Sequence, residues 1–218
     1  MVIAGFIVGF DTEEKGVARG MIDCIEAMSI PVCMVGLLTA LPNTQLTRRL
    51  EREKRLLPLV VEEGDHCTEG LNFLTARPRR DILADYRDVL AVVYAPEAFF
   101  HRLRTVCRAL KPPRHPVKLE PRVLAHNLKF FWRVMWRMTF VEREYARHFW
   151  HTLASTAWHS PYTLKYMIFH IAFYLHLGPF SQFVIRRLEH EMDELDRHPP
   201  ARHAAHISQP QLAVAAAS

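Results

Sequence analysis

Two apolar runs of strand length open the chain and flank an amphipathic segment. The runs cover residues 2–10 and 32–38. Between them, Val17, Met21 and Ile25 recur about one turn apart, which predicts a helix with one apolar face. A near-continuous apolar run is typical of a strand that helices cover on both faces. The pattern therefore predicts one right-handed parallel strand–helix–strand unit.

Helical patterns dominate the rest of the chain. We expect a short surface helix over residues 43–55, capped by Asn43 or Thr44, and then a less regular segment with a short strand at 71–74. Apolar spacing predicts further helices over 79–93, 96–110, 121–140, 141–158 and 161–196. We expect the last of them to break near Gly178 and Pro179, because proline removes a helical hydrogen bond.

Composition narrows the class of protein. The chain has 218 residues, half of them hydrophobic, which is enough for a sizeable core. Its formal charge of +5 favours anionic partners only weakly. The four cysteines show no CxxC or CxxxCxxC spacing, which argues against a disulfide framework and against a self-contained zinc or iron-sulfur site. With no basic region ahead of the apolar start, we expect a cytoplasmic protein and no secretion signal.

Several motifs occur in an order that resembles a known family. They are the Gly5-x-Ile7-x-Gly9 strand, the LLTALP segment at 37–42, the helix over 44–57, the GLNF segment at 70–73 and YAPEAFFHR at 94–102. Together they resemble the later half of a radical S-adenosylmethionine (SAM) barrel. More narrowly, the chain resembles the C-terminal part of cobalamin-binding radical SAM proteins of the hopanoid-methylase type, with the C-terminal domain of unknown function found in that family.

The resemblance implies an α/β fold. It would comprise the C-terminal portion of a partial βα, TIM-like barrel followed by an all-α C-terminal extension. The implied divisions are barrel strands and helices at 1–78, a helical part of the family's C-terminal domain at 79–110, a proline-rich linker at 111–118, a helical extension at 119–196 and a disordered tail at 197–218.

The resemblance also implies a site for the adenine of SAM. The residues that match the family's pattern are Gly5, Ile7, Gly9, Val35 and Gly36. Glycines let the backbone approach a ligand closely, and an apolar side chain can pack on a flat purine. The family's acidic residue in this turn is not matched, because Asp11 falls one place early and Thr12 stands at the expected position.

Two parts of the family's machinery are missing from these residues. The chain has no CxxxCxxC loop for a four-iron four-sulfur cluster, and the resemblance implies that the N-terminal half, with its cobalamin-binding domain, is absent. We therefore expect a C-terminal fragment or split half of an enzyme for methyl transfer, or a related radical modification, of an apolar substrate. We expect it to be inactive alone, and its own status as an enzyme is uncertain.

Site assignments follow from this view. We assign no catalytic residue and no metal ligand, and we expect no cofactor for this chain alone, although the parent family uses SAM, the cluster and cobalamin. A separate polypeptide carrying the cluster and cobalamin domains is the implied partner. Thr68 and Asn72, which the resemblance implies lie near the mouth of a barrel, are candidate substrate-binding residues.

The helix expected near 122–140 is the basis of an alternative function. Lys129, Arg133 and Arg137 recur at four-residue spacing, with Trp132 and Trp136 between them. A solvated face of a helix bundle is the favoured interpretation; the other is peripheral contact with an anionic membrane. The alternative is thus a non-catalytic helical module that binds a membrane surface or a protein partner, and we expect no nucleic acid.

A second membrane question concerns residues 166–185, which contain no Asp, Glu, Lys or Arg. The length of this window nearly suffices to span a bilayer. However, His170, Ser181 and Gln182 interrupt it, and polar groups are costly in hydrocarbon. We therefore expect a buried or interfacial helix here.

Overall fold

The computed structural model describes residues 3–57, 70–112 and 121–198. Thr68, most of the predicted linker and nearly all of the predicted tail lie outside the described residues. The described elements are β1 (Ile3–Val8), α1 (Val17–Ala27), β2 (Val32–Leu37), α2 (Gln45–Arg52), α3 (Arg79–Val93), α4 (Pro96–Ala109), α5 (Pro121–Trp136), the π-helix η1 (Arg137–Val141), α6 (Arg143–His159), the 3-10 helix η2 (Pro161–Thr163) and α7 (Leu164–Arg197).

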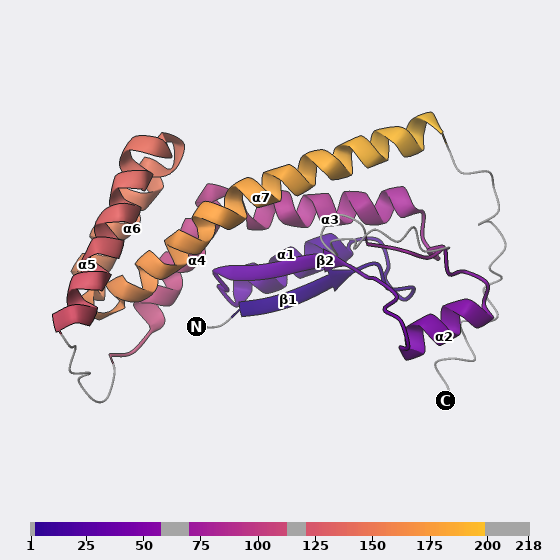
Figure 1. Ribbon diagram of the computed structural model, residues 1–218, viewed down its shortest axis with the longest axis horizontal. Coiled ribbons are helices and arrows are strands. Elements are labelled where there is room, and N and C mark those ends of the chain that lie inside the picture. The colour runs from indigo at the N-terminus through magenta and orange to yellow at the C-terminus, as the bar shows by residue number, and fades with distance from the viewer. Residues whose placement is uncertain (1–2, 58–69, 113–120, 199–218) are drawn as a thin grey trace. The chain divides into compact units, whose positions relative to one another are not determined.

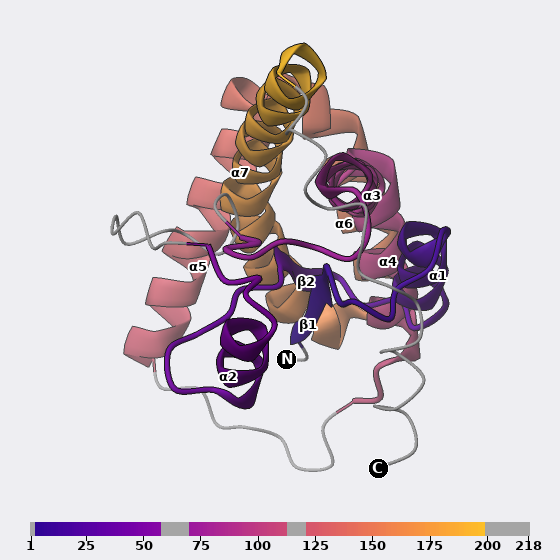
Figure 2. The ribbon, with the colours of Figure 1, turned by 90° about the vertical axis from the view of Figure 1, so that its right-hand side faces the viewer.

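The structure is mainly helical with one small parallel sheet, which is an α/β arrangement. The order β1, α1, β2 confirms the predicted strand–helix–strand unit. The two strands pair side by side, as both Figure 1 and Figure 2 show. At their carboxyl ends, the Leu38 N–H donates to the Val8 carbonyl at 2.8 Å.

The faces of the strands differ from expectation. Exposure alternates along β1, where the Ile7 side chain is 49% exposed and Val8 is buried. On β2, Met34 is 62% exposed and Val35 is buried. The prediction that helices cover both faces is therefore wrong for the described residues. An apolar run reports a tendency to be buried, whereas actual burial depends on which neighbouring segments are present.

The short helix α2 begins as predicted. Thr44 is its N-cap, and the Thr44 hydroxyl accepts a hydrogen bond from the Thr47 N–H at 3.2 Å. The strand expected at 71–74 is reduced to a single antiparallel bridge between Leu56 and Phe73. This bridge still ties the chain after α2 to the 70–73 segment.

The break expected at Gly178 and Pro179 does not occur, because α7 runs through Pro179 without interruption. The Ser181 hydroxyl donates to the Gly178 carbonyl at 2.7 Å. A proline inside a helix costs about 3 kcal/mol. Tyr174 and Val184, on either side of it, are buried, and this packing offsets the cost.

The run from Pro161 to Arg197 is long and apolar enough to cross a membrane, judged by length and composition alone. However, 44% of its most apolar window is buried within the structure. Met167, Ile168 and Ile171 belong to a hydrophobic core. The helix therefore contributes to that core, which agrees with the first part of the expectation of a buried or interfacial helix.

Contacts divide the chain into two units. Unit 1 contains Met1–Gly5, Arg19–Met34 and Val89–Phe183, and unit 2 contains Phe6–Ala18, Val35–Asp88 and Val184–Ser218. The core of unit 1 is built on α4, α5, η1, α6 and α7 by Phe99, Phe100, Leu103, Cys107, Val134, Met138, Tyr145, Phe149, Met167, Ile168, Ile171 and Tyr174. Within this unit, the hairpin of α5, η1 and α6 stands out in Figure 1.

A fully buried arginine joins two parts of unit 1. The Arg102 guanidinium, on α4, forms an ion pair with Glu26 near the end of α1 and donates to the Ile30 carbonyl at 2.9 Å. Buried charges are tolerated when they are paired and hydrogen-bonded. Burial also raises the pKa of the nearby Cys33 thiol to about 11, so this cysteine stays protonated.

Candidate functional site

The candidate site lies in unit 2, where β1 and β2 end. Its first part is the turn after β1. Gly9 has a positive φ of 116°, and a Cβ atom there would lie 2.7 Å from Cδ2 of Leu71. The Gly9 N–H donates to both carboxylate oxygens of Glu13, at 3.0 and 2.9 Å. Gly9 is therefore required by the turn itself, and its contact with a ligand stays a prediction.

Asp11 holds this turn to the segment after β2. Its carboxylate pairs with Arg55 at 2.6 Å and with Arg49 at 2.8 Å. Burial alone would raise the pKa of Asp11, but the hydrogen bond and charge of Arg55, with the charge of Arg49, lower it below its ordinary value. The same hydrogen bond to Asp11 raises the pKa of Arg55. Asp11 therefore has a structural partner on another segment.

Glu13 is a further residue of this turn that the sequence patterns above do not single out. Its carboxylate accepts from the backbone of the turn, four residues earlier. The signal that could have identified it is a carboxylate closely following a strand-ending glycine. Such a turn leaves a backbone N–H without a sheet partner, and buried N–H groups need an acceptor.

The 70–73 segment packs against the end of β2. A Cβ atom on Gly70 would lie 2.1 Å from the Cβ atom of Leu37, so only glycine fits. The Leu71 N–H donates to the Leu38 carbonyl at 2.9 Å. Arg79, at the start of α3, donates to the carbonyls of Leu71 at 2.7 Å and Gly70 at 3.3 Å. The GLNF segment at 70–73, one of the motifs of the family resemblance, thus fixes the chain at the end of β2. We call these contacts the brace.

Asn72 completes this brace. Its Oδ1 accepts from the Ala40 N–H at 2.8 Å, and its Nδ2 donates to the Ala40 carbonyl at 3.0 Å. The two polar atoms of the carboxamide are therefore engaged with the backbone of the loop after β2. The predicted substrate-binding role of Asn72 stays a prediction.

An apolar surface is open at the same strand ends. Ile7, Phe10 and Leu41 are all exposed. Gly36 is partly buried, whereas the Val35 side chain is buried and its carbonyl accepts from Tyr86 at 3.0 Å. The Ile7 side chain is therefore accessible to a ligand from solvent, whereas the Val35 side chain is not.

Gly5 lies in unit 1, on the preceding part of β1. It is exposed, and no heavy atom lies within 4 Å of a Cβ atom placed on it. The backbone here is open to a ligand from one side, as a close approach to a flat ring requires.

The described residues fit the proposed cofactors unequally. An exposed isoleucine with neighbouring glycines suits the adenine ring of SAM. By contrast, no three His, Cys, Asp or Glu side chains of the described chain come together as metal ligands. An iron-sulfur cluster is therefore not assigned to these residues.

The fold and the strand-end surface define an α/β protein with an exposed apolar face at the ends of its strands. Residues 44–190 match the family model described as a domain of unknown function, DUF4070, and the chain belongs to that family. No solved structure matches the chain.

Two curated relatives extend this result. The chain is 30% identical to an uncharacterized methyltransferase of Synechocystis sp. over 197 residues, which cover 89% of this chain and 36% of the relative. It is 35% identical to a hopanoid C-2 methylase of Rhodopseudomonas palustris over 101 residues, which cover 46% of this chain and 18% of the relative. The predicted resemblance is confirmed, and the chain spans only a minor part of each relative.

Proposed function

We propose that this chain supplies part of a radical SAM methylase-type enzyme that modifies an apolar substrate. In this proposal β1, α1 and β2 form the last part of a partial βα barrel. The open face of β1, where Ile7 is exposed, carries the proposal together with the names of the two relatives. Barrel strands alternate inward and outward residues, so the exposed residues would line the barrel interior.

The proposed ligand of this face is the adenine of SAM. The Ile7 side chain would pack on the purine, and Gly5 and Gly36 would let the ring approach the backbone closely. When bound, SAM supplies the methyl group or the radical. The Asp11–Arg55 ion pair and the contacts of the 70–73 segment would hold the strand ends in place around it.

The remaining chemistry requires residues outside this sequence. The cluster and cobalamin would be held by segments on the same polypeptide or on a separate partner, because no CxxxCxxC loop occurs here. The chain by itself is therefore proposed to be inactive. The proposal includes a cytoplasmic location, supported by the free thiols of Cys24, Cys33 and Cys107.

The test is SAM cleavage by the polypeptide or complex that contains both this chain and a CxxxCxxC loop, reconstituted without oxygen. Ile7→Asp should lower cleavage at least about tenfold, because it places a carboxylate where the purine would pack. Met28→Asp is the matched control, since Met28 is exposed just after α1, and it should leave cleavage unchanged. Equal activity of the two variants would contradict the proposal.

A further inference from the structure

Helix α5 and the following π-helix η1, both in unit 1, carry an exposed surface of unusual composition. Residues 121–141 contain no Asp or Glu. Trp132 and Trp136 are 58% and 62% exposed, and Phe140 and Val141 are exposed beyond them. Large exposed apolar patches on a protein mark interaction surfaces. We call the surface formed by Lys129, Trp132, Arg133, Trp136, Phe140 and Val141 the α5 face.

The opposite side of this helix is already occupied. Val134 and Met138 are buried in the core of unit 1. The exposure of the α5 face therefore follows from the orientation that the core imposes. The tryptophans lie on the exposed side.

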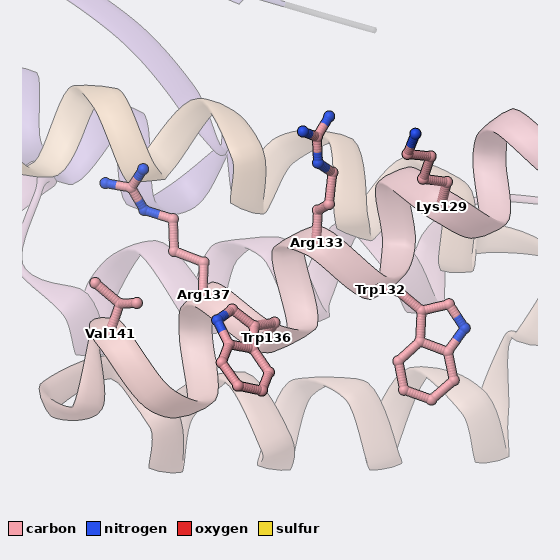
Figure 3. Close-up of a pocket in the computed structure, with 6 residues that line it drawn as sticks. All are labelled: Lys129, Trp132, Arg133, Trp136, Arg137 and Val141. Atoms are coloured by element: carbon pink, nitrogen blue, oxygen red, sulfur yellow. The ribbon is translucent and has the colours of Figure 1, made fainter.

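Cations and aromatic rings form two neighbouring rows along the α5 face. Figure 3 shows Lys129 and Arg133 extending to one side of the helix and the rings of Trp132 and Trp136 to the other. The rings of Trp136 and Phe140 lie 4.4 Å apart, which joins α5 to η1. Among the described residues, neither Lys129 nor Arg133 has a carboxylate partner, whereas Arg137 pairs with Glu142 at 3.1 Å.

We propose that the α5 face docks on the surface of an anionic lipid bilayer, with the helix lying in the plane of the interface. Interfacial helices place Trp and Phe at the headgroup boundary and Lys or Arg beside them. The absence of acidic residues over 121–141 complements a negatively charged leaflet.

A protein partner fits this surface less well. The cores of protein interfaces are enriched in tryptophan and arginine, but they are depleted of charged residues as a whole and of lysine in particular. Here Lys129 and Arg133 are interleaved with the tryptophans along the sequence. Long basic side chains can extend from an apolar surface towards lipid phosphates without being desolvated. This docking is independent of the proposed SAM site, which involves other residues.

The experiment is co-sedimentation of the full chain with vesicles of phosphatidylcholine alone or with about 30% phosphatidylglycerol, a composition chosen to reproduce an anionic surface. Binding should require the anionic lipid and should weaken on raising the salt concentration. Trp132→Ala/Trp136→Ala should reduce partitioning at least about tenfold. Lys129→Gln/Arg133→Gln should reduce it about fivefold per charge.

Two control variants lie elsewhere in unit 1. Trp158→Ala removes a highly exposed tryptophan of α6, and Lys165→Gln removes an exposed cation of α7. Both should bind vesicles like the wild type. Circular dichroism should show the same helix content in every variant, because all the altered side chains are exposed.

Three results would overturn the proposal. One is a wild-type chain that does not bind anionic vesicles. Another is equal loss of binding in the α5-face variants and the controls. The third is a wild-type chain that is a dimer in sedimentation and does not bind vesicles, while the Trp132→Ala/Trp136→Ala variant is a monomer. The α5 face would then join two copies of this chain.

Discussion

The side chain of Asn72 makes two hydrogen bonds to the backbone of Ala40. Its Oδ1 accepts from the Ala40 N–H at 2.8 Å, and its Nδ2 donates to the Ala40 carbonyl at 3.0 Å. These residues are far apart in the sequence and meet where β2 ends. The contact fixes the loop after β2 against the 70–73 segment. Its removal would loosen the strand ends on which the proposed ligand face depends.

Asn72→Ala should therefore lower the free energy of unfolding by about 1–3 kcal/mol, because both backbone groups of Ala40 lose their partner. Urea denaturation of the chain measures this change. Gln45→Ala, at an exposed position at the start of α2, is the control and should stay within about 0.5 kcal/mol of the wild type. Equal stability of the two variants would show that the carboxamide is dispensable.

Gly70→Ala should lower the free energy of unfolding, whereas a glycine whose added Cβ atom meets open space should tolerate the same change. The added Cβ atom would lie 2.1 Å from the Leu37 Cβ atom, so the strand end or the segment must move. We expect a loss of at least about 2 kcal/mol, as for overpacking in a core. Gly20→Ala is the control: it meets open space within α1 and should stabilise by about 0.5–1 kcal/mol. A Gly70→Ala variant as stable as the wild type would refute the close approach.

The Asp11–Arg55 pair should make stability depend on pH. The pKa of folded Asp11 lies below its ordinary value of 3.8, so the folded state favours the carboxylate. This contribution is present above pH 3.8 and is lost as the pH falls through the lower folded pKa. Asp11→Asn should lose about 1–3 kcal/mol at neutral pH, because Arg55 loses its ion pair with Asp11 and keeps its pair with Glu53.

The measurement is the free energy of unfolding of wild type and Asp11→Asn from pH 7 down to the acid limit of folding. The difference between them should be constant at neutral pH and should shrink only below pH 3.8. A difference that shrinks between pH 7 and pH 5 would contradict the assignment to Asp11.

Arg102→Ala should destabilise unit 1. It would remove the ion-pair partner of the partly exposed Glu26 and leave the Ile30 carbonyl without its donor, and we expect a loss of at least about 2 kcal/mol. Arg108→Ala, on an exposed turn of the same helix, should cost no more than about 1 kcal/mol. Thermal unfolding followed by circular dichroism compares the two variants. Similar melting temperatures would contradict the structural role of the buried Arg102 side chain.

Local signals predicted the elements well. The starts of α3 and α4, the Thr44 cap and the strand–helix–strand unit all follow from apolar spacing and from residues next to them in the sequence. The continuity of α7 could not be predicted, because the cost of Pro179 is offset by tertiary packing that no local pattern reveals.

The candidate site was predicted only in part. The Gly5-x-Ile7-x-Gly9 pattern lies on β1 and the GLNF motif lies against the end of β2, while the ligand-binding role of these residues stays a prediction. The pairing of Asp11 with Arg55, and the contact between Gly70 and Leu37, join residues that are far apart in the chain. Only the folded structure brings such residues together, and the same is true of the buried orientation of Val35.

The central claim is that the open face of β1 receives the adenine of SAM. The most direct measurement is a titration of the isotope-labelled chain with S-adenosylhomocysteine, followed by amide NMR shifts. We predict shifts at Gly5, Ile7 and Gly36, and their loss in Gly5→Val, whose side chain enters open space and leaves the fold intact. No shift at these amides at millimolar ligand, or shifts that persist in Gly5→Val, would contradict the claim.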